Sequence, residues 1–215
     1  MSERKEGVIF DLDGVLCSTD EYHYRAWKSL ADSLGIAFDR TVNRRLRGVS
    51  REESLEIVLE KAGKEYSAEE KRQLCSQKNE LYRKFLSELS EKDLLPGAKG
   101  ALHELRRSGL KLAIGSSSKN ARFILQKLQI DGEFDAIVDG NDISHSKPHP
   151  EVFLCAADRL GLSSGQCAVV EDAHAGIVAA KAGGFYALAI GDARSDPLAD
   201  GRLERLQDLV KLLCR

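Results

Sequence analysis

Gly7-Val8-Ile9-Phe10-Asp11-Leu12-Asp13-Gly14 is a short apolar run that ends in two carboxylates, two residues apart. We interpret the apolar part as a buried strand. Side chains alternate faces along an extended chain, so Asp11 and Asp13 are expected to point the same way where the strand opens into a loop. A divalent cation or a shared proton would relieve their repulsion. With magnesium bound, one carboxylate could attack a phosphoryl group while the other moves protons.

Length and composition narrow the class of protein. The 215 residues, 42% of them hydrophobic, are enough for one ordinary domain and a smaller insertion. A net charge of -2 with 31% charged residues argues against general attraction to nucleic acid or membranes. No apolar run approaches the roughly 18 residues that a membrane span needs. We therefore expect a cytoplasmic monomer whose partners are small molecules, with no nucleic acid and no membrane.

The five cysteines are odd in number and far apart, and none has the spacing of a zinc or redox motif. We expect reduced thiols that pack as small apolar groups. Cys17 lies near the paired carboxylates, but a nucleophilic thiol would need a cationic neighbour that the sequence does not place. The carboxylates explain more of the pattern, so they are preferred as the reactive groups.

Three helical patterns follow the first strand with no strand between them. The first covers about 21–34. The second begins at Ser50 and the third at Ser67, each with a glutamate three residues on, Glu53 and Glu70, which is typical of a capping box. The third runs to about residue 89. This break in the strand pattern predicts an inserted helical domain.

From Pro96 onward strands and helices alternate, which favours a parallel sheet covered by helices on both faces. The predicted fold class is α/β, a Rossmann-like core with a central parallel sheet plus an inserted all-helical cap. We assign residues 1–17 and 94–215 to the core and residues 18–93 to the cap. The expected core helices are 97–108, 120–128, 150–160 and 174–182, and the expected strands are 111–115, 136–138, 168–170 and 187–190.

Polar clusters follow these strands, where active residues of such sheets gather. Ser116-Ser117-Ser118 precedes a helix and could bind a phosphate. Helix capping explains the serines equally well when they are taken alone, but their position after a strand favours the phosphate. Lys147 suits an anionic ligand, but most loop lysines are merely solvated. Glu171-Asp172 could simply complement a helix dipole. That alternative does not explain acids at two separate strand ends, so a magnesium site with Asp11 and Asp13 is preferred.

Three features of the inserted domain have ordinary explanations of their own. Arg47-Gly48-Val49-Ser50-Arg51 places two guanidinium groups at a helix start and is either a ligand-binding loop or a charged, solvated one. His23 alone is more typical of a partly buried histidine than of a catalytic one. Lys78 alone would be assigned to the surface.

Taken together, these residues resemble the haloacid dehalogenase superfamily, and within it the β-phosphoglucomutase family. The superfamily's four motifs match Asp11-Leu12-Asp13-Gly14-Val15, Ser116, Lys147-Pro148 and Glu171-Asp172. The match to the narrower family spans nearly the whole chain and adds Thr19-Asp20-Glu21-Tyr22-His23, Gly48-Val49-Ser50-Arg51, Gln77-Lys78-Asn79 and Ser116-Ser117-Ser118-Lys119-Asn120.

The resemblance implies a role for each matched residue. Asp11 would be the nucleophile and Asp13 the general acid and base. Magnesium would be held by the carboxylates of Asp11, Glu171 and Asp172 and by the Asp13 backbone carbonyl. Ser116 and Lys147 would bind the transferring phosphoryl group, Thr19 would lie at the hinge, and His23 and Lys78 would couple cap closure to Asp13. The implied substrate-binding residues are Arg47, Gly48, Val49, Ser50, Arg51, Lys78, Ser117, Ser118, Lys119 and Asn120.

The implied reaction converts β-D-glucose 1-phosphate into glucose 6-phosphate, with β-glucose 1,6-bisphosphate as intermediate and activator. Two departures from the family pattern, Arg47 in place of a common lysine and Ser117 in place of a smaller residue, are expected to affect sugar preference. A sugar-phosphate phosphatase with the same aspartyl-phosphate chemistry is the first alternative. A non-catalytic metal or sugar-phosphate binding module is the second.

Overall fold

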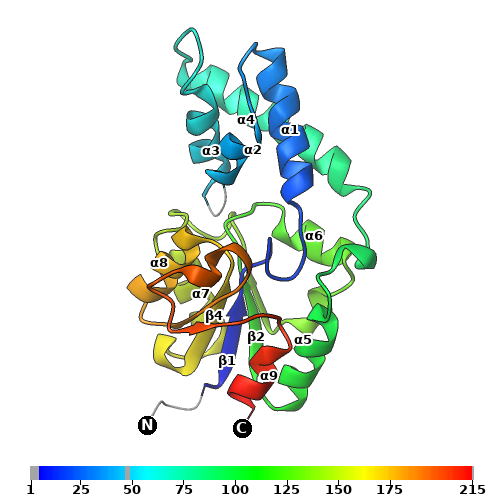
Figure 1. The fold of residues 1–215 in the computed structure, drawn as a ribbon, viewed down its shortest axis with the longest axis vertical. Helices are drawn as coiled ribbons and strands as arrows, with labels where there is room; N and C mark the ends of the chain where they lie inside the picture. The colour runs from blue at the N-terminus through cyan, green and yellow to red at the C-terminus, as the bar shows by residue number, and fades with distance from the viewer. Residues whose placement is uncertain (1–4, 47–48, 215) are drawn as a thin grey trace.

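The computed structural model describes residues 5–46 and 49–214, and it has an α/β core with a group of helices above it (Figure 1). The core sheet has six parallel strands in the order β3-β2-β1-β4-β5-β6. The strands are β1 Gly7–Phe10, β2 Lys111–Gly115, β3 Ala136–Val138, β4 Cys167–Glu171, β5 Tyr186–Ala189 and β6 Gly201–Arg202.

Helices cover both faces of this sheet, as the alternating sequence pattern predicts. In β1, Val8 and Phe10 belong to one buried layer and Ile9 to the other, because successive side chains point to opposite faces. The first layer packs against α5 Ala98–Arg107, α6 Ala121–Lys127 and α9 Asp208–Leu213. The second packs against α7 Glu151–Leu160 and α8 His174–Ala182. The predicted α/β fold class is confirmed.

The helical part above the core is made of α1 Asp20–Ser33, α2 Arg40–Arg44, α3 Arg51–Leu59 and α4 Ala68–Leu86. It has an apolar cluster of its own around Trp27, Leu30 and Leu55. Both predicted capping boxes are present: the Glu53 amide donates to Ser50 Oγ at 3.1 Å, and the Glu70 amide donates to Ser67 Oγ at 3.2 Å. These reciprocal bonds satisfy amide groups that the first turns of α3 and α4 leave open.

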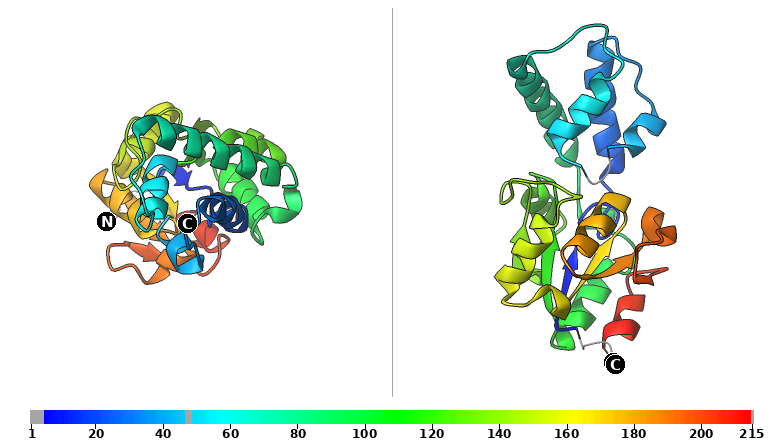
Figure 2. Two further views of the ribbon diagram at one scale, coloured as in Figure 1. Left: turned by 90° about the horizontal axis from the view of Figure 1, so that it is seen from above. Right: turned by 90° about the vertical axis from the view of Figure 1, so that its left-hand side faces the viewer.

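Two connections join this cap to the core, and they run side by side (Figure 2). Cys17 forms an antiparallel bridge with Leu94, and the Leu95 amide donates to the Leu16 carbonyl at 2.8 Å. At the same level Tyr82 and other side chains of α4 join the core's apolar cluster. The predicted cap boundaries, residues 18 and 93, stay a prediction.

The structure adds short elements that the sequence pattern did not predict, namely α2, β6, α9 and the 3-10 helices Glu91–Asp93, Asp131–Glu133, Ser164–Gln166 and Gly191–Ser195. The five residues of α2 are too few for an apolar period. Its N-cap residue is Asp39, whose carboxylate accepts from the Thr41 and Val42 amides. All five cysteines are free thiols, as expected. Within the described ranges, no helix is both long and apolar enough to cross a membrane.

Candidate active site

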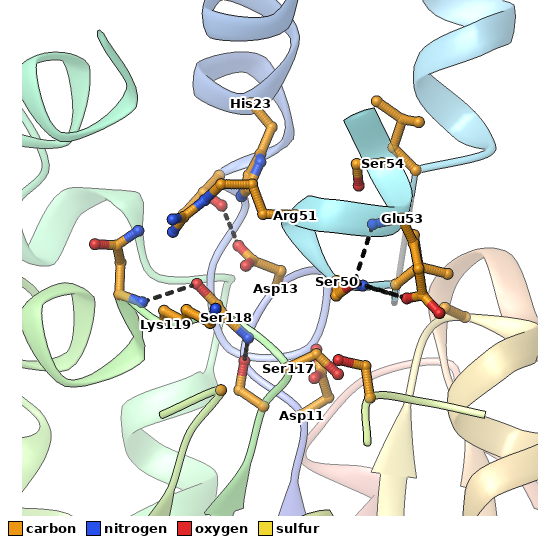
Figure 3. Close-up of a pocket in the computed structure, with 18 of the residues that line it drawn as sticks. Asp11, Asp13, His23, Ser50, Arg51, Glu53, Ser54, Ser117, Ser118 and Lys119 are labelled. Atoms are coloured by element: carbon orange, nitrogen blue, oxygen red, sulfur yellow. Dashed lines mark hydrogen bonds between the residues drawn. The ribbon is translucent and has the colours of Figure 1, made fainter. Parts of the chain in front are cut away.

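A cavity of about 850 Å³ lies between the carboxyl ends of the strands and the cap helices (Figure 3). Its position follows from the parallel sheet, whose loops after β1, β2 and β4 all open at this edge. Arg47 and Gly48 lie outside the described residues. The predicted site residues that line the cavity are Asp11, Asp13, Thr19, His23, Val49, Ser50, Arg51, Lys78, Ser116, Ser117, Ser118, Lys119, Asn120, Glu171 and Asp172.

Lys147 is buried beside the acidic groups, where sequence spacing alone favoured a solvated loop lysine. Its Nζ lies 2.5 Å from Asp11 Oδ1 and 2.6 Å from Glu171 Oε1. Carboxylate oxygens of Asp11, Glu171 and Asp172 lie within 4.8 Å of one another. One ammonium among three buried carboxylates leaves an excess of negative charge, and oxygen donors of this kind suit magnesium. The residues present therefore fit the predicted metal.

Burial at this site also shifts the pKa values of Asp11 and Lys147. Burial raises the pKa of Asp11 to about 7, with a smaller contribution from the charge of Glu171, while Lys147 acts in the opposite direction. Burial also opposes ionisation of Lys147, but the charges of Asp11 and Glu171 outweigh it and raise the pKa of the ammonium. Lys147 therefore remains a cation next to the predicted nucleophile.

Two glycines leave the room that these carboxylates occupy. A Cβ at Gly14, whose φ is +79°, would lie 2.0 Å from Asp172 Oδ2. A Cβ at Gly176, in the first turns of α8, would lie 1.9 Å from Glu171 Oε1. Glu171 cannot simply turn aside, because Lys147 and the Ala173 amide both hold its carboxylate. The close approach of backbone and acid thus requires glycine at both positions.

Asp13 is connected to the cap by a chain of hydroxyl groups. The Thr19 hydroxyl donates to Asp13 Oδ1, and the Tyr82 hydroxyl donates to Thr19 Oγ1 at 3.0 Å. Burial raises the pKa of Asp13, although the hydrogen bond from Thr19 opposes this. A carboxyl group with a raised pKa that lines the cavity is suited to hold and release a proton.

His23, which is partly buried, and Lys78, which is buried, contact each other on the cap side of the cavity. Lys78 is only 2% exposed, and its Nζ lies 3.0 Å from His23 Nδ1, so the assignment of an isolated Lys78 to the surface is wrong. Burial, together with the charge of Arg51, holds the pKa of Lys78 well below its usual range. Burial and the charge of Lys78 likewise lower the pKa of His23. The charge of Lys78 in turn lowers the pKa of Asp13 slightly, while the coupling of His23 to Asp13 stays a prediction.

The serine loop after β2, Ser116-Ser117-Ser118, is held by hydrogen bonds of its own and also faces the cavity. The Ser118 amide donates to Ser116 Oγ at 3.2 Å, and the Asn120 amide donates to Ser118 Oγ at 3.3 Å. Ser117 Oγ is buried and has no hydrogen-bond partner among the described residues. Both bonds lie within the loop and do not cap α6, which begins at Ala121 and whose N-cap residue, Asn120, has no side-chain cap hydrogen bond. The two hydroxyls act as acceptors here, and their donor protons stay available to a ligand.

Tyr82 and Glu52 line the cavity, and Asn79 contacts a residue that lines it, yet none of the three was assigned a role from the sequence. Tyr82 follows Lys78 by one helical turn, and this spacing was a usable signal. Glu52 contacts Lys119 Nζ at 2.8 Å, and Asn79 accepts from Asn120 Nδ2 at 2.9 Å, so both join the cap to the core. No local pattern in the sequence marks these two contacts, because each depends on how the cap lies on the core.

Comparisons with known proteins agree with this architecture. Residues 5–184 match the haloacid dehalogenase-like hydrolase family. The chain is 44% identical to a β-phosphoglucomutase of Bacillus subtilis over 95% of its own length and 92% of the relative. It is 31% identical to a phosphorylated carbohydrates phosphatase of Thermotoga maritima over 84% and 82% of the two chains. A crystal structure of β-phosphoglucomutase from Clostridium difficile aligns with a TM-score of 0.90 at 36% identity, covering 95% and 93%.

Proposed function

Because the chain belongs to the haloacid dehalogenase-like hydrolase family, we propose that it is a β-phosphoglucomutase that interconverts β-D-glucose 1-phosphate and glucose 6-phosphate. The observation that carries the proposal is that charged side chains of both the core and the cap line one cavity. Asp11 contacts Lys147 on the core side, and Arg51 reaches into the cavity from the cap (Figure 3). A sugar bisphosphate needs charged groups from both sides, whereas transfer from a small phosphate ester needs only those of the core.

On the core side, a carboxylate oxygen of Asp11 attacks the phosphorus, and the bond from phosphorus to the sugar oxygen breaks. Asp13 gives its proton to that leaving oxygen. In the reverse half-reaction, Asp13 takes the proton of a sugar hydroxyl, and the hydroxyl oxygen attacks the aspartyl phosphate. The Ser116 hydroxyl and the Lys147 ammonium offset the charge of the transferring phosphoryl group.

Magnesium is the cofactor in this proposal, held by the carboxylates of Asp11, Glu171 and Asp172 and by the Asp13 carbonyl. Bound there, it would supply positive charge to phosphoryl oxygens. Three buried carboxylates with one ammonium support this choice. The activator is β-glucose 1,6-bisphosphate, which phosphorylates Asp11 and is also the intermediate of the reaction.

The distal phosphate would be bound by Arg51 with Ser118, Lys119 and Asn120. The intermediate can then present either of its phosphates to Asp11 after turning round. Cap closure over the sugar would exclude water from the aspartyl phosphate, with the Thr19, His23 and Lys78 contacts tying the cap to Asp13. The predicted cytoplasmic location and monomeric state stay predictions.

The alternative, a sugar-phosphate phosphatase, shares the core side of the cavity, and the relative from Thermotoga maritima carries such a name. Arg51→Ala separates the two functions. We expect it to lower mutase kcat/KM by about a hundredfold or more, because it removes a charged contact with the distal phosphate. Hydrolysis of a small phosphate ester should change little.

Arg45→Ala is the matched control, because Arg45 is a cap arginine that pairs with Glu60 within the cap, at 2.7 Å. It should affect neither activity. Equal losses of mutase and hydrolase activity in Arg51→Ala would contradict the distal-phosphate role.

A further inference from the structure

A second group of metal-ligating side chains lies apart from the acidic site, between β3 and the first turn of α7. It consists of His145, His149 and Glu151, in the sequence His145-Ser-Lys-Pro-His149-Pro-Glu151. One ligand atom from each residue lies within 4.8 Å of the others. We propose that these three side chains bind a divalent transition-metal ion of the zinc type. This proposal does not depend on the reaction proposed above.

The distances suit a small tetrahedral ion. Glu151 Oε2 lies 2.9 Å from His145 Nδ1 and 3.9 Å from His149 Nδ1. Ligands bonded to zinc at about 2.0–2.1 Å lie about 3.4 Å apart in a tetrahedron, a value between the two distances. The imidazole rings lie 4.8 Å apart, centre to centre. Small side-chain rotations would therefore complete the coordination.

Backbone contacts hold the carboxylate in place before any ion arrives. The Ser144 amide donates to Glu151 Oε1 and the His145 amide to Glu151 Oε2, each at 2.8 Å. The first of these bonds, with help from His145, lowers the pKa of Glu151, so the group is an anion at neutral pH. The Glu151 amide donates to His149 Nδ1 at 3.3 Å, so this nitrogen carries no proton, and an ion bound there would take the lone pair that now accepts from the amide. The two amide bonds to the Glu151 carboxylate are of the kind that orients metal ligands.

The donor set also separates this cluster from the acidic one. Two imidazoles and one carboxylate suit zinc and related ions, whereas magnesium prefers oxygen ligands and keeps its waters. Three protein ligands leave a fourth position open for water or another ligand. The competing explanation is an ordinary surface ion pair, since the side chains of His145 and His149 are 67% and 52% exposed. That explanation predicts no metal affinity beyond that of other surface histidines.

The position of the histidine cluster would let a bound ion affect the cavity. Both histidines line the mouth of the cavity, and Lys147 lies between them in the chain. An ion held by His145 and His149 would close a short ring around the segment that carries Lys147. Metal binding here would therefore restrain Lys147, which contacts Asp11, without using the magnesium ligands.

The test measures zinc binding to the full chain with magnesium in excess, by competition with a chromophoric chelator. The variant is His145→Gln combined with His149→Gln. The control is His103→Gln, since His103 is an exposed histidine that also contacts a glutamate, Glu133, at 2.9 Å. Background binding by thiols is the same in all three proteins, so the difference between their isotherms isolates the cluster.

We expect the wild type and His103→Gln to bind one more equivalent of zinc than the double variant. The affinity for that equivalent should be at least about tenfold higher than the affinity of the double variant for any zinc ion that it binds through surface histidines. Cobalt should give the visible absorption of a tetrahedral site in the first two proteins only. Identical zinc isotherms in the wild type and the double variant, or identical cobalt spectra, would overturn the proposal.

Discussion

Lys119 Nζ lies 2.8 Å from a carboxylate oxygen of Glu52, and this ion pair joins the loop after β2 to the first turn of α3. Figure 3 shows Lys119 beside the serine loop, on the core side of the cavity. In our proposal the same ammonium binds the distal phosphate. Glu52 and the substrate would therefore compete for one cation.

Glu52→Gln removes the competitor and keeps the size of the side chain. We expect KM for β-glucose 1-phosphate to fall about two- to fivefold, because exposed ion pairs of this kind contribute only a fraction of a kcal/mol to about 1 kcal/mol. The matched control is Glu56→Gln, which breaks the Glu56–Lys71 pair within the cap, 2.7 Å long. Steady-state kinetics decide the matter: a higher KM in Glu52→Gln alone would show that the pair assists binding by holding the cap closed.

Lys78 is expected to reduce stability while it serves activity. Its ammonium lies 4.4 Å from the ring centre of Tyr82 and 4.9 Å from that of Trp27, contacts that favour the cation, yet burial dominates and lowers its pKa. Lys78→Met should therefore raise the free energy of unfolding by about 2 kcal/mol at pH 7, measured in urea. Mutase turnover should fall, because His23 loses its partner.

The stability difference between Lys78→Met and the wild type should change with pH in a definite direction. The unfolded chain binds the Lys78 proton up to a pKa of about 10.4, whereas the folded chain releases it at lower pH. Between the two values the stability of the wild type rises with pH. The advantage of Lys78→Met should thus shrink as the pH approaches about 10. An advantage that is constant with pH, or a less stable variant, would show that Lys78 is charged in the folded protein.

Asp142, which does not itself line the cavity, provides a test at acid pH. Its carboxylate accepts from Arg159 at 2.8 Å and from Arg122 at 3.2 Å, and chiefly the Arg159 bond lowers its pKa to about 2. This stabilisation is complete above the ordinary pKa of about 3.9 and is lost as the pH falls toward 2. Partial exposure screens the interaction, so Asp142→Asn should cost about 1 kcal/mol at pH 7.

The cost of Asp142→Asn should shrink in urea unfolding experiments once the pH drops below about 4. Asp158→Asn, which changes an exposed carboxylate on α7, is the control and should show no such trend. A cost that stays the same from pH 7 to pH 3 would mean that the hydrogen-bond geometry, and not the charge of Asp142, provides the stabilisation.

The sequence predicted those parts of the site that depend on local pattern and sheet topology. Asp11, Ser116 and Glu171 each follow a recognisable apolar strand, and parallel strands bring such residues to one edge. The capping boxes at Ser50 and Ser67 were equally local signals. Fold class and the cavity residues at strand ends therefore follow from physical rules applied to the sequence.

The remaining parts depend on tertiary packing. Burial of Lys78 arises where α4 crosses α1, and an isolated lysine in an amphipathic helix carries no mark of that contact. Lys147 is equally buried, although its position in a loop predicts a solvated side chain. Glu52 and Asn79 meet the core only through the position of the cap, which no short stretch of sequence specifies.

The central claim is that Asp11 transfers a phosphoryl group between two positions of one sugar. The most direct measurement is phosphorus NMR of the protein with magnesium, β-glucose 1-phosphate and a catalytic amount of β-glucose 1,6-bisphosphate. We predict conversion to glucose 6-phosphate with little free phosphate, and no conversion by Asp11→Asn. Accumulation of free phosphate in place of glucose 6-phosphate would identify a phosphatase, and turnover by Asp11→Asn would contradict the covalent mechanism.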